Sequence, residues 1–335
     1  MESKEQREMT SENLLELNDL KTYFFTSRGV VKAVDGVSFT IKEAETLGLV
    51  GESGCGKTIT CLSILRLVPA PAGRIVGGEI IFEGENLLSM SEKEMRNIRG
   101  RKISMILQDP MVSLNPVFTV GDQVAEPVRI HQKLTPRLVW EKVKEMLTLV
   151  RIPSPEVRMK EYPHQMSGGM RQRIVGAMVL SCQPRLLIAD EPTTSLDVTI
   201  QAQFLKLLKE IQQQQNLAMI MVTHDLGIVA KVCDRVAVMY AGKIVEIGGV
   251  RDIFYSPAHP YTKALLGSLP KMDVKKERLY TIEGQPPELH DLPPGCSFSP
   301  RCPHVEEICK QEYPPQSIIK DGHLVNCWLC ASRKG

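Results

Sequence analysis

The stretch GESGCGKT, residues 51–58, decides the fold of this 335-residue chain. It has the pattern GxxxxGK[ST], a glycine-rich loop whose backbone N–H groups surround the phosphates of a nucleotide. The preceding letters ETLGLV indicate a buried strand, and the stretch from Lys57 to Val68 has helical spacing that stops at PAP, residues 69–71. A strand, this loop and a helix, in that order, are the context that the motif requires. We therefore expect a phosphate-binding site here.

Individual residues of this loop have expected roles. Lys57 should reach the β- and γ-phosphates, and the Thr58 hydroxyl should bind Mg²⁺. The helix that begins here directs the positive end of its dipole toward the anion. An ordinary glycine-rich turn is the alternative, and the motifs downstream disfavour it. The predicted nucleotide contacts in this segment are Gly51, Glu52, Ser53, Gly54, Cys55, Gly56, Lys57, Thr58 and Ile59.

A second glycine-rich turn and an acidic strand end follow downstream. The turn SGG lies in YPHQMSGGMRQR, residues 162–173, and the strand LLIAD ends at Asp190 with Glu191 directly after it. Asp190 is placed to hold Mg²⁺ through water, and Glu191 to polarise an attacking water. Two carboxylates at a strand end can also be solvated residues without a role. The phosphate loop in the same chain favours the magnesium role.

Composition limits the class of protein. The chain has 41 basic and 39 acidic residues and a net charge of +2. This balance does not indicate binding to nucleic acid or to an anionic membrane surface. No uncharged apolar run approaches the ~18 residues that cross a bilayer. The charged start MESKEQREMTSENLLEL lacks the apolar core of a signal peptide. We expect a cytosolic chain that touches a membrane only through partners.

The order of predicted elements indicates an α/β protein. Short strands precede the phosphate loop, and buried strands then alternate with helices, which implies a largely parallel sheet. RVAVMYAGKIVEIG, residues 235–248, reads as a hairpin around Ala241 and Gly242. Beyond about Ser256, proline is dense and periodicity fades. The predicted organisation is a tail at 1–12, a main domain at 13–255 with a helical insert at about 115–165, and an irregular extension at 256–335.

The motifs together resemble a known family. GESGCGKT, Gln108, MSGGM, LLIADEP, SLD and His224 stand in the order found in the ATP-binding subunits of ABC transporters, over nearly the whole chain. ILQDPMVSLNP, ADEPTTSLDVTIQAQ, HPYTKALL and GCSFSPRCP further resemble the ATPase subunits of bacterial dipeptide and oligopeptide importers. The resemblance implies a P-loop ABC-type ATPase fold. This fold has a mixed, largely parallel sheet, an N-terminal antiparallel β subdomain, a helical insert and a small irregular cysteine-rich C-terminal extension.

The resemblance implies roles for the polar residues of the site. Gln108 would sense Mg²⁺ and the γ-phosphate, so Thr58, Gln108 and Asp190 are the expected magnesium ligands. Glu191 would be the catalytic base, and His224 would contact the γ-phosphate. Both are expected to be catalytic.

The resemblance also implies contacts across a subunit interface and to adenine. Asp197, in SLD, would cross the interface between two ATPase chains. Phe24 is the residue chosen for stacking on adenine, with Tyr23 and Phe25 as alternatives and hydrophobic packing as the other reading. The signature expected to close on ATP of the opposite subunit is Ser167, Gly168 and Gly169.

Five of the nine cysteines crowd into the last 40 residues, which in a reducing cytosol favours metal binding over disulfides. Importer ATPases with a GCxFxxRCP tail resemble iron–sulfur proteins, which implies a [4Fe-4S] cluster. Zinc and free thiols remain alternatives, Cys330 is expected to be surplus, and His304 and His323 are expected to be loop residues rather than ligands. The expected cluster ligands are Cys296, Cys302, Cys309 and Cys327.

The function that the resemblance implies is that of an ATP-hydrolysing motor subunit for uptake of di- or oligopeptides. The alternatives are an importer for nickel or another small solute, and a soluble ABC ATPase outside transport. ATP and Mg²⁺ are the expected substrate and cofactor. The expected partners are two transmembrane permeases, a second ATP-binding subunit (a copy or a paralogue) and, indirectly, an extracytoplasmic solute-binding protein, but no nucleic acid. The expected location is the cytoplasmic face of the cell membrane.

Overall fold

The computed structural model describes residues 13–108, 113–193, 197–269 and 282–331. These residues form two compact units, each assembled from separate stretches of the chain. The first unit contains residues 41–46 and 89–222. The second contains residues 15–40, 47–88 and everything described from 223 onward, so the phosphate loop and the C-terminal tail belong to the same unit.

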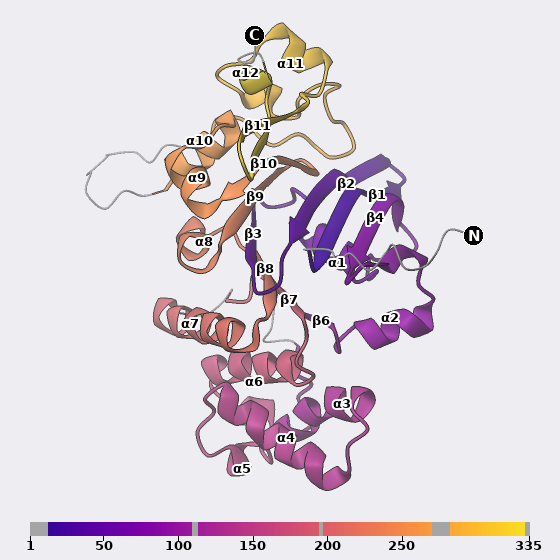
Figure 1. Ribbon diagram of the computed structural model, residues 1–335, viewed down its shortest axis with the longest axis vertical. Coiled ribbons are helices and arrows are strands. Elements are labelled where there is room, and N and C mark those ends of the chain that lie inside the picture. The colour runs from indigo at the N-terminus through magenta and orange to yellow at the C-terminus, as the bar shows by residue number, and fades with distance from the viewer. Residues whose placement is uncertain (1–12, 109–112, 194–196, 270–281, 332–335) are drawn as a thin grey trace. The chain divides into compact units, whose positions relative to one another are not determined.

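The second unit has an antiparallel sheet near the N-terminus, as predicted, with the strand order β2-β1-β4-β5 (Figure 1). Strand β1 alternates buried leucines with more exposed residues, which is the pattern of a strand with one covered face. It pairs antiparallel with β4, with Leu15 opposite Phe82. The strands are β1 (Leu15–Thr26), β2 (Gly29–Ile41), β4 (Gly73–Phe82) and β5 (Glu85–Asn86).

The second unit also holds a mixed set of five strands. Strand β3 pairs parallel with β9, and β9 forms a hairpin with β10 through Ala241 and Gly242. Their φ values of 45° and 83° are those of a hairpin turn with two left-handed residues, which confirms the predicted hairpin. The strands are β3 (Thr46–Val50), β9 (Arg235–Tyr240), β10 (Lys243–Gly249), β11 (Gln316–Lys320) and β12 (His323–Asn326).

The tail is more regular than the sequence predicts. Strand β12 pairs antiparallel with β10, and β11 pairs antiparallel with β12, so the extension adds a hairpin beside β10. Its short strands lack a run of alternating apolar residues, which is why periodicity did not indicate them. The helices of this unit are α1 (Lys57–Ile64), α8 (Leu226–Val232), α9 (Val250–Tyr255), α10 (Pro260–Gly267), α11 (Glu307–Gln311) and α12 (Trp328–Ala331).

The first unit contains three strands that pair in parallel: β6 with β7, and β7 with β8. Every residue of β7 and β8 is buried, which is typical of parallel strands covered on both faces. The strands are β6 (Ile103–Ile106), β7 (Leu186–Asp190) and β8 (Ala218–Val222).

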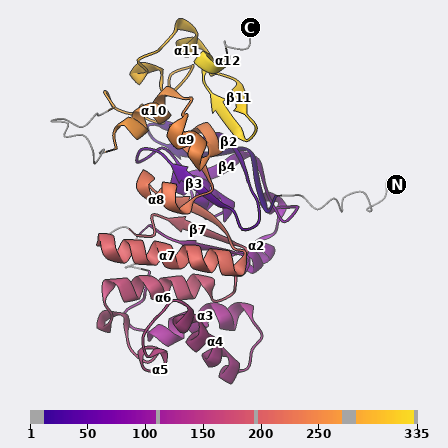
Figure 2. The ribbon, with the colours of Figure 1, turned by 60° about the vertical axis from the view of Figure 1, so that its left-hand side comes forward.

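The helical insert is confirmed in the first unit. Three of its helices contain or begin at prolines noted in the sequence: α3 contains Pro127, and Pro136 and Pro155 begin α4 and α5. Figure 2 shows α6 and α7 running side by side next to this insert. The helices are α2 (Glu92–Ile98), α3 (Val120–His131), α4 (Pro136–Leu149), α5 (Pro155–Arg158), α6 (Gly168–Leu180) and α7 (Val198–Gln215). None of the helices in the described ranges combines the length and apolar character needed to cross a membrane.

Candidate nucleotide site and cysteine cavity

The phosphate loop joins the end of β3 to the start of α1 and has three glycines with positive φ. These angles are 154° at Gly51, 78° at Gly54 and 106° at Gly56. A Cβ atom would stand 2.1 Å from the carbonyl oxygen of Met239 at Gly51, and 2.1 Å from that of Ala33 at Gly56. At Gly54 it would meet nothing within 4 Å. Two of the glycines are therefore required by close backbone approach as well as by φ.

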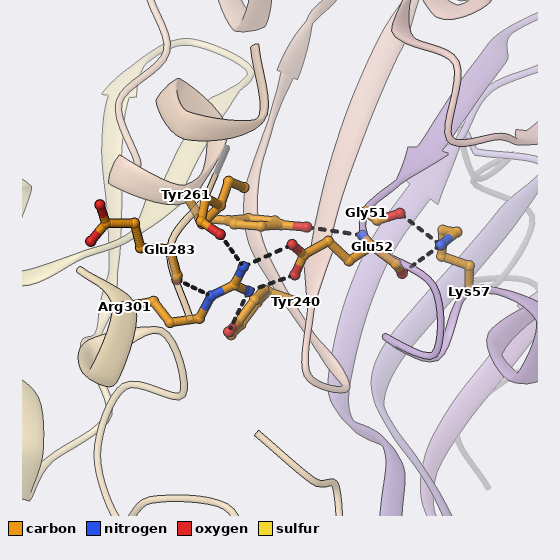
Figure 3. Close-up of polar contacts among 8 residues, drawn as sticks. Gly51, Glu52, Lys57, Tyr240, Tyr261, Glu283 and Arg301 are labelled. Carbon is orange, nitrogen blue, oxygen red and sulfur yellow. Dashed lines mark hydrogen bonds and ion pairs between the residues drawn. The ribbon is translucent and has the colours of Figure 1, made fainter. Parts of the chain in front are cut away.

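Lys57 is held at the loop by the loop's own carbonyl groups. Its side-chain ammonium donates to the carbonyl oxygens of Gly51 at 2.8 Å and Glu52 at 2.9 Å, as Figure 3 shows. The thiol of Cys55 lies 3.7 Å from the same nitrogen, and burial raises the pKa of Cys55. An ammonium group at the first residue of helix α1 gives this loop the positive potential that a phosphate group requires.

The two predicted carboxylates lie at the end of β7 in the first unit. Asp190 is buried at 1% exposure, and Glu191 is half-buried. Glu191 has φ of 46°, and its N–H donates to the carbonyl oxygen of Val222 at 2.9 Å. A left-handed backbone costs a residue with a side chain about 1–2 kcal/mol, and such strain is frequent at functional sites. It turns the chain sharply out of the strand directly after Asp190.

The signature and Asp197 each cap a helix of the first unit. The Ser167 hydroxyl accepts from the N–H of Met170 at 3.3 Å at the start of α6. Asp197 accepts from the N–H of Ile200 at 2.9 Å at the start of α7. A Cβ atom at Gly169 would stand 2.8 Å from the Ile200 side chain, so the two helix starts pack closely and this glycine is needed between them. Ser167 and Asp197 are both exposed, as a contact to a second chain requires.

The remaining predicted polar residues are divided between the units. Gln108 is exposed after β6 in the first unit, and the segment 109–112 that follows it lies outside the described residues. His224 is exposed in the second unit, next to Asp225, which caps α8 by accepting from the N–H of Gly227 at 2.7 Å. The phosphate loop and His224 therefore belong to one unit, and Gln108, the signature and the carboxylates to the other.

The three aromatic candidates for adenine lie in β1 and differ in their surroundings. The Tyr23 hydroxyl donates to Asp35 at 2.6 Å, and burial, helped by this carboxylate, raises the pKa of Tyr23. Phe24 is half-buried beside Gly73, where a Cβ atom would stand 2.8 Å from its ring. Phe25 is 47% exposed. The choice of Phe24 stays a prediction.

The four predicted cluster cysteines line one small cavity of about 20 Å³ in the tail. Burial raises the pKa of Cys296 to about 11 and that of Cys327 to about 12. Cys302 and Cys309 lie on the same cavity wall, whereas Cys330 does not. Among the residues that the structure describes, no three His, Cys, Asp or Glu side chains are arranged to hold a metal ion. The cavity therefore gathers the thiols without forming a coordination site in this conformation.

A buried carboxylate, which sequence reasoning missed, joins the tail to β10. Glu246 is 1% exposed and accepts from the N–H groups of Ala258 at 2.7 Å and His259 at 2.9 Å. His323 Nε2 lies 2.8 Å from the same carboxylate. The expectation that His323 is a loop residue is wrong: it lies in β12, also 1% exposed.

A second missed contact links the tail to the phosphate loop. Arg301 forms an ion pair with Glu52, 249 residues away, at 2.7 Å (Figure 3). The available signal was the arginine inside GCSFSPRCP, a positive charge between two clustered cysteines. Its partner could not be deduced without the fold.

Comparison with protein families gives two matches along the chain. A model described as "ABC transporter" matches residues 34–194. A second model, described as "Oligopeptide/dipeptide transporter, C-terminal region", matches residues 245–309, which include three of the cavity cysteines. Both the nucleotide motifs and the tail therefore have counterparts in described families.

Individual relatives match over nearly the whole length. The dipeptide transport ATP-binding protein DppD of Bacillus subtilis is 54% identical over 95% of this chain and 95% of its own. The oligopeptide transport ATP-binding protein OppD of Salmonella typhimurium is 49% identical over 94% of this chain and 93% of its own. Among solved structures, cbiO1 of Clostridium perfringens, part of an ABC transporter complex, has a TM-score of 0.63 at 27% identity, covering 73% of this chain and 92% of its own.

Proposed function

The chain belongs to the ABC transporter family of ATP-binding subunits, and we propose that it hydrolyses ATP to drive the uptake of di- or oligopeptides. The observation that carries this proposal is the combination of a phosphate loop with a peptide-transporter tail in one chain. The relatives that match along both segments are described as dipeptide and oligopeptide transport proteins. A soluble ABC ATPase outside transport is disfavoured by the match of this tail to a peptide-transporter region.

In the proposed mechanism, the phosphate loop holds the triphosphate and the Glu191 carboxylate activates water. Lys57 and the N–H groups of the loop bind the β- and γ-phosphates. Glu191 accepts a proton from the attacking water while His224 holds the γ-phosphate. Mg²⁺, when bound, neutralises phosphate charge. Its proposed ligands are the oxygen atoms of Thr58, Gln108 and Asp190, which are the donor type that this ion prefers.

Each chain is proposed to supply half of each ATP site. The signature, Ser167 to Gly169, would cover ATP held by the phosphate loop of a second ATP-binding subunit, with Asp197 beside it. Both helix caps are exposed and available for this contact. ATP would then bind the two subunits together, and hydrolysis would release them.

Membrane permeases are the proposed partners that locate the chain at the cytoplasmic face of the membrane. Exposed apolar side chains near Gln108 support this contact. Leu107 is 50%, Val117 71% and Phe118 53% exposed, and apolar side chains on this surface suit a contact with a partner.

Two substitutions test the ATPase proposal in the transporter assembled with its permeases. Glu191→Gln should reduce steady-state hydrolysis by about 100-fold or more while ATP still binds, because only the proton acceptor is lost. Lys57→Ala should instead weaken ATP binding itself. Normal hydrolysis in Glu191→Gln would refute the assignment of the base. Stimulation of hydrolysis by nickel and not by peptides, each offered with its binding protein, would refute the peptide assignment.

We also propose that the cavity cysteines bind a [4Fe-4S] cluster. The support is the donor set, four thiols on one cavity, which is the ligand type of such clusters. A cavity of about 20 Å³ has space for about one water molecule, so cluster binding requires the thiols to move apart.

The cluster proposal is tested by anaerobic purification. The protein should be brown, with absorption near ~400 nm and about four iron atoms per chain. Cys302→Ser should abolish the colour, and Cys330→Ser, outside the cavity, is the matched control. Colourless protein with one zinc per chain would replace the cluster by a zinc site.

A further inference from the structure

The acidic residue of the phosphate loop, Glu52, is not explained by the nucleotide motif. It occupies a variable position of GxxxxGK[ST], and its carboxylate lies on a loop that binds a highly negative ligand. A carboxylate on such a loop opposes the binding of phosphate groups unless a cation lies between or beside them. The structure supplies one: both oxygens of the Glu52 carboxylate are bound by the Arg301 guanidinium, at 2.7 Å and 3.0 Å (Figure 3).

Arg301 is fixed in this position by the rest of its donors. Its Nε donates to the carbonyl oxygen of Glu283 at 3.0 Å, and a terminal nitrogen donates to the hydroxyl of Tyr240 at 3.2 Å. The Arg301 side chain is only 4% exposed and that of Glu52 only 25%. A buried, bidentate ion pair is stronger than an ion pair on the surface, and salt screens it less.

The backbone of Glu52 is held separately from its side chain. Its N–H donates to the hydroxyl of Tyr261 at 2.9 Å, and Tyr261 is fully buried against the Tyr240 ring, 4.6 Å away between centroids. The carbonyl oxygen of Glu52 accepts from the Lys57 ammonium. One continuous chain of contacts therefore runs from the tail through Glu52 to the lysine that binds phosphate.

We propose that Arg301 is a positioning residue for the phosphate loop: it neutralises and orients Glu52, so the tail supports ATP binding directly. This inference rests on the proposed ATPase function. It predicts a specific electrostatic pattern. Without Arg301, the unpaired Glu52 carboxylate repels the phosphates, and removing that charge as well restores ATP binding. A tether that only stabilises the fold predicts neither effect.

The test is the ATP affinity of the full chain and of its variants, measured by titration with a fluorescent ATP analogue. Arg301→Ala should raise Kd roughly tenfold, the size of one like-charge interaction near a protein surface. Glu52→Gln with Arg301→Ala should return Kd to within about threefold of the unaltered chain. Arg301→Lys should give a Kd between those of Arg301→Ala and the double variant, because an ammonium keeps the charge but lacks the two parallel N–H donors that the guanidinium directs at the carboxylate. Arg251→Ala, an exposed arginine in α9 of the same unit, is the matched control and should bind normally.

The outcomes separate the possible causes. A Kd within twofold of normal for Arg301→Ala, or no recovery in the double variant, would overturn the positioning role even if the melting temperature falls. Binding stoichiometry near one per chain shows that the variants are folded. If Arg301→Ala does not fold, Arg301→Lys and Glu52→Gln still test the pattern, because Glu52→Gln alone should not weaken binding. An unaltered chain that binds no ATP, or binds as well with Lys57→Ala, would contradict the proposed function instead.

Discussion

Two alanine substitutions in the phosphate loop separate backbone strain from close packing. Gly54 and Gly56 both have positive φ, so alanine at either position is strained by about 1–2 kcal/mol. At Gly54 the new methyl group enters open space, but at Gly56 it would stand 2.1 Å from the carbonyl oxygen of Ala33. That oxygen belongs to the backbone of β2 and cannot rotate away as a side chain could.

The expected losses of stability therefore differ. Gly54→Ala should lower the free energy of unfolding by about 1–2 kcal/mol, from strain alone. Gly56→Ala adds the cost of overpacking, about 1–3 kcal/mol, and should lower it by about 2–5 kcal/mol in total. A change of this size is a large part of the stability of an average protein.

Urea unfolding followed by tryptophan emission measures the difference in stability between the two variants, provided that the emission comes from the second structural unit. The chain has two tryptophans, and only Trp328 lies in the second unit with the phosphate loop. A Trp140→Phe background therefore makes the emission report on that unit. Equal unfolding midpoints for the two alanine variants would refute the argument from the Ala33 carbonyl group, since the backbone strain is common to both.

Three further substitutions test other contacts. Burial lowers the pKa of His259 to about 3, so below pH 6.5 the unfolded chain binds a proton at this residue and the folded chain does not. The free energy of unfolding should therefore fall by about 1.4 kcal/mol for each pH unit below pH 6.5. His259→Asn, which keeps a helix cap, should remove this slope in urea titrations between about pH 7 and pH 5. His323→Leu should cost about 2 kcal/mol or more in the same assay, because the buried Glu246 carboxylate loses a partner, and a change within the error of the unaltered chain would contradict this. Ser91→Ala removes the capping box of α2 and should lower the stability of the first unit by about 1 kcal/mol, read from Trp140 emission in a Trp328→Phe chain; no shift of the midpoint would show that the cap is not needed.

The sequence predicts well what is encoded within a few neighbouring residues. GESGCGKT specifies the phosphate loop because glycine spacing and the following helix are local properties, and Ala241-Gly242 specifies its hairpin for the same reason. The apolar run before Asp190 likewise predicts a buried strand.

Contacts between distant stretches were not predictable. Neither Glu52 nor Arg301 has a neighbour that reveals the other, and His323 has no local pattern that marks a buried strand residue. The gathering of the cysteines was expected from their number and spacing. The size of their cavity and the exclusion of Cys330 from its wall depend on how the tail folds back.

The hairpin that the tail adds beside β10 also covers a strand edge that could otherwise pair with strands of other chains. On its other side, β10 pairs with β9, so without β12 it would be an unpaired edge strand. Its apolar residues Val245 and Ile247 are each only 3% exposed. An apolar edge strand can pair with strands of other chains. Among the described residues, β11 is the outer strand of this hairpin, and its length of five residues, a register irregularity near its end and the charged Lys320 discourage such pairing. A chain cut short after Ser256 would therefore be prone to aggregate, even if its nucleotide motifs were intact.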